Sequence, residues 1–222
     1  MSFWKKIMKI KIEDKLDLKI AVSLIEDLKN ENSDFPYEQL CELGREYKRK
    51  FNGINLGSVP GVKETRALFK SLGIDPTKHR PSSEALLNRA LKDKGFFKIN
   101  TLVDIANWCS LDFLLPICVY DFSKIKEPII VRKGSEDEYY LGHNRRRVNL
   151  YNRFLVADAS GAFGSPVTDS VRTAVETNTT DAFLVIFAPS ATDTDILAEK
   201  SDIFTKRIIE LCGGKVTENE LL

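Results

Sequence analysis

The sequence has no long apolar run and no excess of charge of one sign. Its 222 residues hold 33 Lys plus Arg against 32 Asp plus Glu, a net charge of +1, so no global field attracts DNA or anionic lipid. No apolar stretch approaches the roughly 18 to 20 residues of a membrane span, and the basic start, Met1–Ile12, lacks the apolar segment of a signal peptide. We therefore expect a cytoplasmic protein with neither membrane nor DNA as a partner.

Cysteine and histidine are also scarce. The two histidines, His79 and His143, fall in loop sequences, and we interpret each as a surface residue rather than a general base. No cysteine belongs to a CxxC pair or has a histidine at ligand spacing, so we predict no metal site and no cofactor. The four are Cys41, Cys109, Cys118 and Cys212.

Mixed helical and strand patterning is present throughout the chain. Apolar spacings of 3 and 4 predict helices over 37–51, 62–72, 84–92, 100–115 and 192–212. Alternating or β-branched runs predict strands over 7–12, 20–24, 116–120, 129–132, 139–141, 154–157 and 182–188. The pattern indicates an α+β fold with a strand-rich C-terminal half, and we expect one domain over 1–222.

Polar side chains recur on one face of the predicted helix 100–115. Asn100, Asp104, Asn107 and Ser110 follow one another at spacings of 4, 3 and 3 within an apolar sequence. Such groups are costly to bury without partners. Asn100 and Asn107 therefore either line a pocket or belong to a satisfied structural network, and for Asp104 we favour the network.

Short basic runs offer local patches for RNA phosphates. Such contacts are salt-dependent and carry no sequence preference, and runs of this kind are also typical of a merely solvated surface. The main candidate is Arg145, Arg146 and Arg147, with support from Lys5, Lys6, Lys9 and Lys11 or from Arg45–Lys50.

Several phrases of the sequence together point to one family. In order and spacing they resemble the B3/B4 (tRNA-binding, editing) module of the phenylalanyl-tRNA synthetase β chain, most strongly over residues 60–190. The segment 164–173 is more similar to freestanding copies of that module. The phrases are Arg80–Leu86, Ile99–Asn107, Leu115–Asp121, Asp158–Gly161 and Gly164–Thr173.

The resemblance implies a fold, a partner and an activity. The fold would be a mixed α/β, three-layer type with two layers of sheet plus helices. A pocket would receive the aminoacyl-adenosine 3′ end of a mischarged tRNA, and the family hydrolyses tyrosine wrongly esterified to phenylalanine tRNA. A pocket that hydrogen-bonds the extra hydroxyl discriminates these amino acids by ~10⁴ to 10⁵. A synthetase is a further expected partner, although the chain lacks the length and motifs of a complete ligase.

The chain departs from the synthetase pattern at two points. Cys118 stands where the synthetase module usually has a histidine, and the Gly-Gly-Glu motif is absent. A lone cysteine among apolar residues is usually a small buried hydrophobe, although a deprotonated thiol would be a nucleophile. In place of the missing motif stands a polar cluster in the segment 164–173.

That cluster supplies the predicted site. Asp169 would receive an ammonium or hydroxyl, and Arg172 a carboxylate, phosphate or developing oxyanion; the alternative is a polar turn capped by Asp and Ser. We assign catalytic roles to Asp169, Ser170 and Arg172. The expected substrate-binding residues are Asn100, Asn107, Cys118, Gly164, Ser165 and Thr173.

Three functions follow as hypotheses. The first is an aminoacyl-tRNA deacylase acting in trans, in which a positioned water and an oxyanion partner cleave an already activated ester. The second is a noncatalytic tRNA- or RNA-binding module. The third is a protein that binds a free amino acid or small metabolite.

Overall fold

The computed structural model describes residues 8–222. Lys5, Lys6 and the first residue of the predicted strand 7–12 lie outside the described residues. Within residues 8–222, no helix combines the length and the apolar character that a membrane crossing requires.

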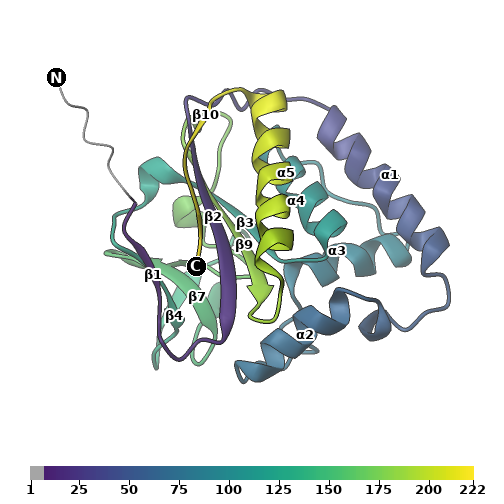
Figure 1. The fold of residues 1–222 in the computed structure, drawn as a ribbon, viewed down its shortest axis with the longest axis horizontal. Helices are drawn as coiled ribbons and strands as arrows, with labels where there is room; N and C mark the ends of the chain where they lie inside the picture. The colour runs from purple at the N-terminus through teal and green to yellow at the C-terminus, as the bar shows by residue number, and fades with distance from the viewer. Residues whose placement is uncertain (1–7) are drawn as a thin grey trace.

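Two four-stranded sheets form the centre of the molecule (Figure 1). The first has the order β1-β4-β7-β8: Ile10–Ile12, Ile129–Lys133, Phe154–Asp158 and Gly161–Gly164. The second has the order β10-β2-β9-β3: Lys215–Leu221, Leu18–Glu26, Ala182–Pro189 and Ile117–Asp121. A separate hairpin pairs β5 with β6: Tyr139–Leu141 and Arg147–Asn149.

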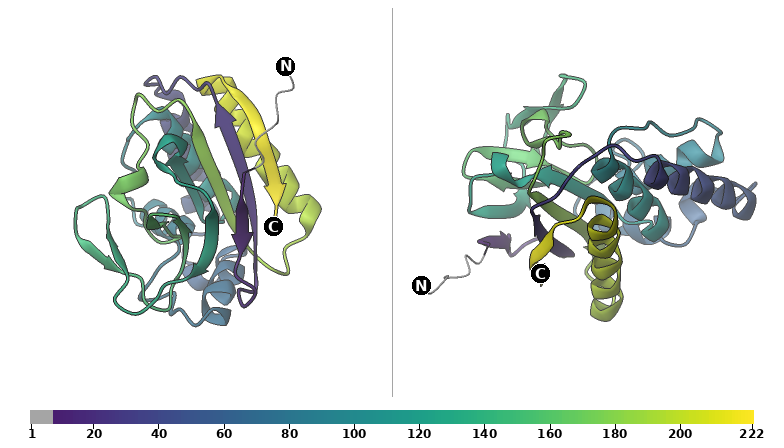
Figure 2. Two further views of the ribbon diagram at one scale, coloured as in Figure 1. Left: turned by 90° about the vertical axis from the view of Figure 1, so that its left-hand side faces the viewer. Right: turned by 90° about the horizontal axis from the view of Figure 1, so that it is seen from above.

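Four helices, α1, α3, α4 and α5, lie on the far side of the second sheet from the first (Figures 1 and 2). Helix α2 instead packs Leu68 and Phe69 into the core between the two sheets. All five lie where apolar periodicity predicts them, because each has one apolar face to bury. They are α1 Phe35–Lys50, α2 Val62–Ser71, α3 Ser82–Leu91, α4 Thr101–Phe113 and α5 Thr194–Cys212.

Buried side chains fill the space between these layers. Phe154 and Phe163 from the first sheet meet Phe183 and Phe187 from the second, and all four are fully buried. Each such ring contributes about 1.5 to 3 kcal/mol through removal from water. A second cluster joins the other face of the second sheet to α4 and α5, and a third joins α1 and α3 to α4. The sheet–sheet–helix layering confirms the predicted fold class.

Strand β3 has a special position because it is the edge of its sheet. It pairs with β9 on one side only. Side chains alternate across a strand, so Cys118 and Tyr120 point into the core between the sheets, while Ile117 and Val119 point toward α4. The open edge of β3 thus lies beside α4, and the candidate site is found there.

Candidate functional site

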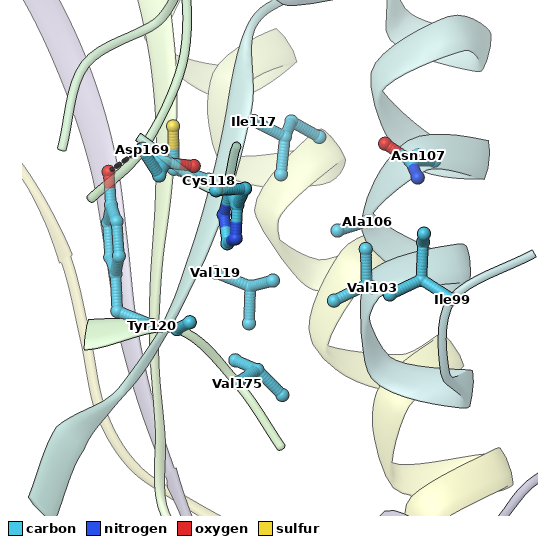
Figure 3. Close-up of a pocket in the computed structure, with 12 residues that line it drawn as sticks. Ile99, Val103, Ala106, Asn107, Ile117, Cys118, Val119, Tyr120, Asp169 and Val175 are labelled. Atoms are coloured by element: carbon cyan, nitrogen blue, oxygen red, sulfur yellow. Dashed lines mark hydrogen bonds between the residues drawn. The ribbon is translucent and has the colours of Figure 1, made fainter. Parts of the chain in front are cut away.

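A cavity of about 390 Å³ lies at the open edge of β3. Figure 3 shows Val103 and Ala106 of α4 on one side of it, Val119 and Val175 on the other, and Asp169 near one end. The walls are predominantly apolar, as in most small-molecule sites. The lining residues are Ile99, Val103, Ala106, Asn107, Ile117, Cys118, Val119, Tyr120, His143, Asp169, Ala174 and Val175.

Helix α4 supplies one wall through its regular spacing. Val103, Ala106 and Asn107 are three and four residues apart, so they share a face. Asn107 is half-buried and brings the only side-chain amide among the lining residues. Asn107 therefore lies in the cavity wall, and its contact with a substrate stays a prediction.

Asn100 and Asp104 lie elsewhere. Asn100 is the N-cap of α4, and its Oδ1 accepts a hydrogen bond of 3.0 Å from the Val103 N–H. Asp104 is fully buried, and its carboxylate accepts the Ile99 N–H at 3.1 Å. The expectation that Asn100 lines the pocket is corrected, because capping already uses its side chain; the network interpretation of Asp104 agrees with the structure.

The backbone of β3 adds polar groups to the opposite wall. The Phe187 N–H donates to the Pro116 carbonyl at 3.0 Å, which makes this pair a hydrogen-bonded one in the β3–β9 ladder. Hydrogen-bonded pairs alternate along antiparallel strands. The peptide groups of Ile117 and Val119 therefore point away from β9, toward the edge where the cavity lies.

Asp169 is the only acid among the described residues that line the cavity. Its Oδ1 accepts hydrogen bonds from the Tyr120 hydroxyl at 2.8 Å and from the Ser165 N–H at 3.2 Å. Burial raises the pKa of Asp169 from its ordinary 3.8 to about 6. The two hydrogen bonds lower the pKa, but their effect is smaller than that of burial. A carboxylate with such a pKa changes protonation close to neutral pH.

Cys118 is buried beside this carboxylate. Its Sγ lies 3.5 Å from the Ser165 carbonyl oxygen. Burial raises the pKa of the Cys118 thiol well above its ordinary range, and the nearby charge of Asp169 raises it further. The thiol therefore stays protonated, which disfavours a nucleophilic role.

The segment 164–173 is held in place by close contacts with neighbouring strands. Gly164 packs so tightly on Tyr120 that a Cβ at position 164 would lie 2.0 Å from the Tyr120 hydroxyl. The Tyr140 hydroxyl lies 3.0 Å from Ser165 Oγ and also hydrogen-bonds the Thr168 carbonyl. These contacts fix the backbone that carries Asp169, and they place Gly164 and Ser165 behind the pocket wall.

The other residues of the predicted cluster serve the loop itself. Arg172 points to Asp158, with Nη1 and Nη2 at 3.0 and 2.9 Å from its two carboxylate oxygens. Ser170 Oγ accepts the Arg172 N–H at 3.1 Å, and Thr173 is fully buried, 3.5 Å from the Phe163 carbonyl. None of the three lines the cavity. The expected oxyanion contact of Arg172 is corrected, because a carboxylate of the protein already occupies its guanidinium.

His143 is a pocket residue that the sequence did not identify. It is exposed, as predicted, but it sits in the β5–β6 connection and lines the cavity. An antiparallel bridge between Gly142 and Ser170 joins that hairpin to the Asp169 segment. A loop histidine carries no periodic signal, so only the tertiary structure reveals its place.

The predicted RNA-contact residues lie on the same hairpin. Arg145, Arg146 and Arg147 are exposed, and the guanidinium of Arg147 stacks 3.8 Å from the centre of the Tyr139 ring. Among residues 8–222, no group of three or more His, Cys, Asp or Glu side chains is placed to hold a metal ion.

The family is decided by a comparison with domain models. The B3/4 domain model matches residues 64–210 of the chain. This protein belongs to the B3/4 domain family. The match lies over the region of the predicted resemblance, which is confirmed.

Relatives of this B3/4-domain protein carry the name phenylalanine–tRNA ligase β subunit. That of Brucella abortus (strain 2308) is 26% identical over 165 positions, covering 63% of this chain and 20% of the relative. That of Paramagnetospirillum magneticum is 26% identical over 191 positions, covering 75% of this chain and 24% of the relative. The chain thus spans about a fifth to a quarter of their length.

A solved structure has the same fold. It is an N-terminal fragment of the phenylalanyl-tRNA synthetase β-subunit from Pyrococcus horikoshii, with a TM-score of 0.53 and 14% identity. The similarity covers 96% of this B3/4-domain protein and 51% of that chain. It confirms the predicted mixed α/β architecture of the synthetase β-chain module.

Proposed function

We propose that this B3/4-domain protein hydrolyses the ester bond of a mischarged aminoacyl-tRNA in trans. The observation that carries the proposal is one half-buried carboxylate, Asp169, with a raised pKa, in a predominantly apolar cavity at a strand edge. The B3/4 domain match and the names of the relatives support an RNA-associated, translation-related module as the setting for this chemistry.

The cavity walls suit an aminoacyl group. The apolar side chains of Val103, Ala106 and Val175 would contact an amino acid side chain, and the half-buried Asn107 amide would orient a polar atom of the substrate. A volume of about 390 Å³ is in the range of small-ligand sites. Binding would therefore remove apolar surface from water and hold the ester near Asp169.

Asp169 would act as general base. Its pKa of about 6 leaves it mostly ionised at pH 7 yet basic enough to accept a proton. As a water oxygen adds to the ester carbonyl carbon, one water proton moves to the Asp169 carboxylate. The tetrahedral intermediate then expels the ribose oxygen, which takes that proton back from Asp169. The products are a free amino acid and an RNA with an intact 3′ end.

The negative charge that develops on the carbonyl oxygen needs a donor. The outward N–H groups of Ile117 and Val119 are fixed at the cavity edge and suit this task without any cationic side chain. This arrangement gives Arg172, Ser170, Thr173 and Gly164 a supporting role, in which they hold the loop that carries Asp169.

The test is release of amino acids from a panel of mischarged tRNAs. We expect wild-type protein to release at least one noncognate amino acid, and Asp169→Asn to reduce the rate by about 10² to 10⁴, as loss of a general base does. The matched control is Asp14→Asn at an exposed aspartate, which should retain full activity. Absence of turnover across the panel, or full activity of Asp169→Asn, contradicts the proposal.

A noncatalytic RNA-binding module is the second candidate. It is favoured by the exposed arginines 145–147 and by Cys118, whose protonated thiol replaces the histidine usual in the synthetase module. In this case tRNA binding should weaken with salt and on triple Arg→Gln replacement at 145–147, without ester cleavage. A gel-shift titration that shows no tRNA complex excludes it.

A further inference from the structure

A second cavity, of about 590 Å³, adjoins the first, and we propose that it binds a phosphate group of the RNA. This proposal rests on the proposed function, because the RNA is the one whose esterified 3′ end enters the Asp169 pocket. We call the second cavity the arginine groove. Its lining residues are Gly142, His143, Asn144, Arg146, Arg147, Val148, Asn149, Arg153 and Thr168.

The groove has the composition of an anion site. Three arginines line it, and no aspartate or glutamate is among the described lining residues. Its other polar side chains include two amides and a threonine hydroxyl, all of which can donate hydrogen bonds. Guanidinium groups match phosphate oxygens in geometry and form charge-assisted hydrogen bonds with them. The whole chain has a net charge of only +1, so this is a local concentration of positive charge.

Arg153 gives the strongest reason to expect an anionic ligand in the groove. It is half-buried, and within residues 8–222 its guanidinium has no ion pair and no hydrogen-bond acceptor. Burial lowers the pKa of Arg153, because a charged group is less well solvated there than in water. A partly buried charge is costly when it has no partner. A phosphate in the groove would supply that partner.

Other half-buried arginines of the chain show the contrast. The side chains of Arg66, Arg132 and Arg172 are 23%, 25% and 32% exposed, and each forms two hydrogen bonds to one carboxylate. Arg207 is 20% exposed and pairs with Asp112 at 2.7 Å. A further half-buried arginine, Arg89, donates to the backbone carbonyls of Gly95 and Lys94. Among the half-buried arginines of residues 8–222, Arg153 therefore differs in having neither a carboxylate nor a carbonyl as acceptor, and it lies in a groove whose described lining holds no acid.

The groove and the Asp169 pocket meet at shared residues. His143 lines both cavities, and Thr168 of the groove directly precedes Asp169 of the pocket. One ligand can therefore extend from one cavity into the other. A nucleotide esterified at its ribose has this form, with the aminoacyl group at one end and a phosphate at the other. Arg153 would bind the phosphate as a positioning residue, with Arg146 and Arg147 beside it.

The test compares 5′-AMP with adenosine in NMR titrations of the intact protein. We expect 5′-AMP to bind at least about tenfold more tightly than adenosine, because only it carries a phosphate. Arg153→Gln should abolish this preference and leave adenosine affinity unchanged. The control is Arg49→Gln at an exposed arginine of α1 that lines neither cavity, and it should keep the preference.

Several results would overturn the proposal. They are equal affinity of wild-type protein for the two ligands, no binding of either, and a preference that survives Arg153→Gln or is lost equally in Arg49→Gln. The hydrolysis assay separates the two proposals. A 5′-AMP preference that depends on Arg153, in a protein that cleaves no ester, supports the phosphate site and contradicts the deacylase. The opposite result is ester cleavage without a 5′-AMP preference and without an effect of Arg153→Gln on KM for tRNA. It supports the deacylase and contradicts the phosphate site.

Discussion

Replacing Asp169 by Asn should stabilise the protein while it removes activity. The asparagine keeps the shape of the carboxylate, and its Oδ1 can still accept from the Tyr120 hydroxyl and the Ser165 N–H. What it removes is a charge in a site where burial raises the pKa from 3.8 to about 6. The variant therefore tests whether the protein maintains a destabilising carboxylate at this position.

The magnitude follows from linkage between proton binding and folding. Below pH 3.8 Asp169 is protonated in both folded and unfolded chains and contributes nothing. Between 3.8 and 6 the folded chain holds a proton that the unfolded chain releases, so wild-type stability falls relative to the variant as pH rises. Above pH 6 the loss is complete, at about 3 kcal/mol, since a difference of one in pKa corresponds to about 1.36 kcal/mol.

The assay is urea unfolding of wild type and Asp169→Asn across pH 4 to 8. The variant should gain about 2.4 kcal/mol over wild type between pH 4 and pH 8, because about 0.6 kcal/mol of the loss has already occurred at pH 4; the gain is equivalent to roughly 5 to 10 °C in Tm. Effects of all other titrating groups cancel in the difference. Asp14→Asn, which removes an exposed carboxylate, is the matched control. The reasoning is refuted if the difference in free energy of unfolding between Asp169→Asn and wild type does not change with pH. It is also refuted if wild type becomes more stable relative to the variant as pH rises.

Three further substitutions test the surroundings of this carboxylate. Tyr120→Phe removes a hydrogen bond that lowers the pKa of Asp169. The acid limb of the pH–rate profile should therefore move to higher pH by about one pH unit. Gly164→Ala forces a Cβ against the Tyr120 hydroxyl and should cost about 1 to 3 kcal/mol in urea unfolding. Arg172→Gln leaves the buried Asp158 carboxylate without its guanidinium and should cost about 3 kcal/mol at pH 7. That pairing lowers the pKa of Asp158 despite burial, so the loss should shrink as pH falls below about 4.

Local periodicity was enough to predict most of the fold. Helices α1 to α5 and the buried strands carry apolar repeats that survive in the structure, because each has one face or both faces in the core. The strands β6, β8 and β10 were not predicted. For β10 the reason is that its sequence Lys215–Leu221 is mostly polar and at most half-buried. This strand forms because it pairs with β2 at the edge of the sheet. Its conformation depends on that long-range pairing and cannot be predicted from its own sequence pattern.

The site was predictable only in part. The resemblance and the polar spacing pointed to Asp169 and Asn107, both of which reach the cavity. Spacing on a helical face does not distinguish a lining side chain from an N-cap, and so Asn100 was misplaced. The partner of Arg172, Asp158, lies 14 residues earlier at the end of β7. Arg153 stands out only because its guanidinium has no acceptor within residues 8–222. Neither property is encoded in the neighbouring residues.

Under the proposed function, the β5–β6 hairpin would bind RNA, and other elements would hold the aminoacyl group. The floor of the Asp169 pocket comes from α4 and β3, which are packed into the central layers, whereas the hairpin contributes His143 to the pocket and most of the arginine groove. Its connection to the remainder includes one backbone bridge, at Gly142 and Ser170. Under the proposed function, grafting residues 139–149 from another family member should change the affinity for RNA, while the pocket side chains supplied by α4 and β3 stay unchanged.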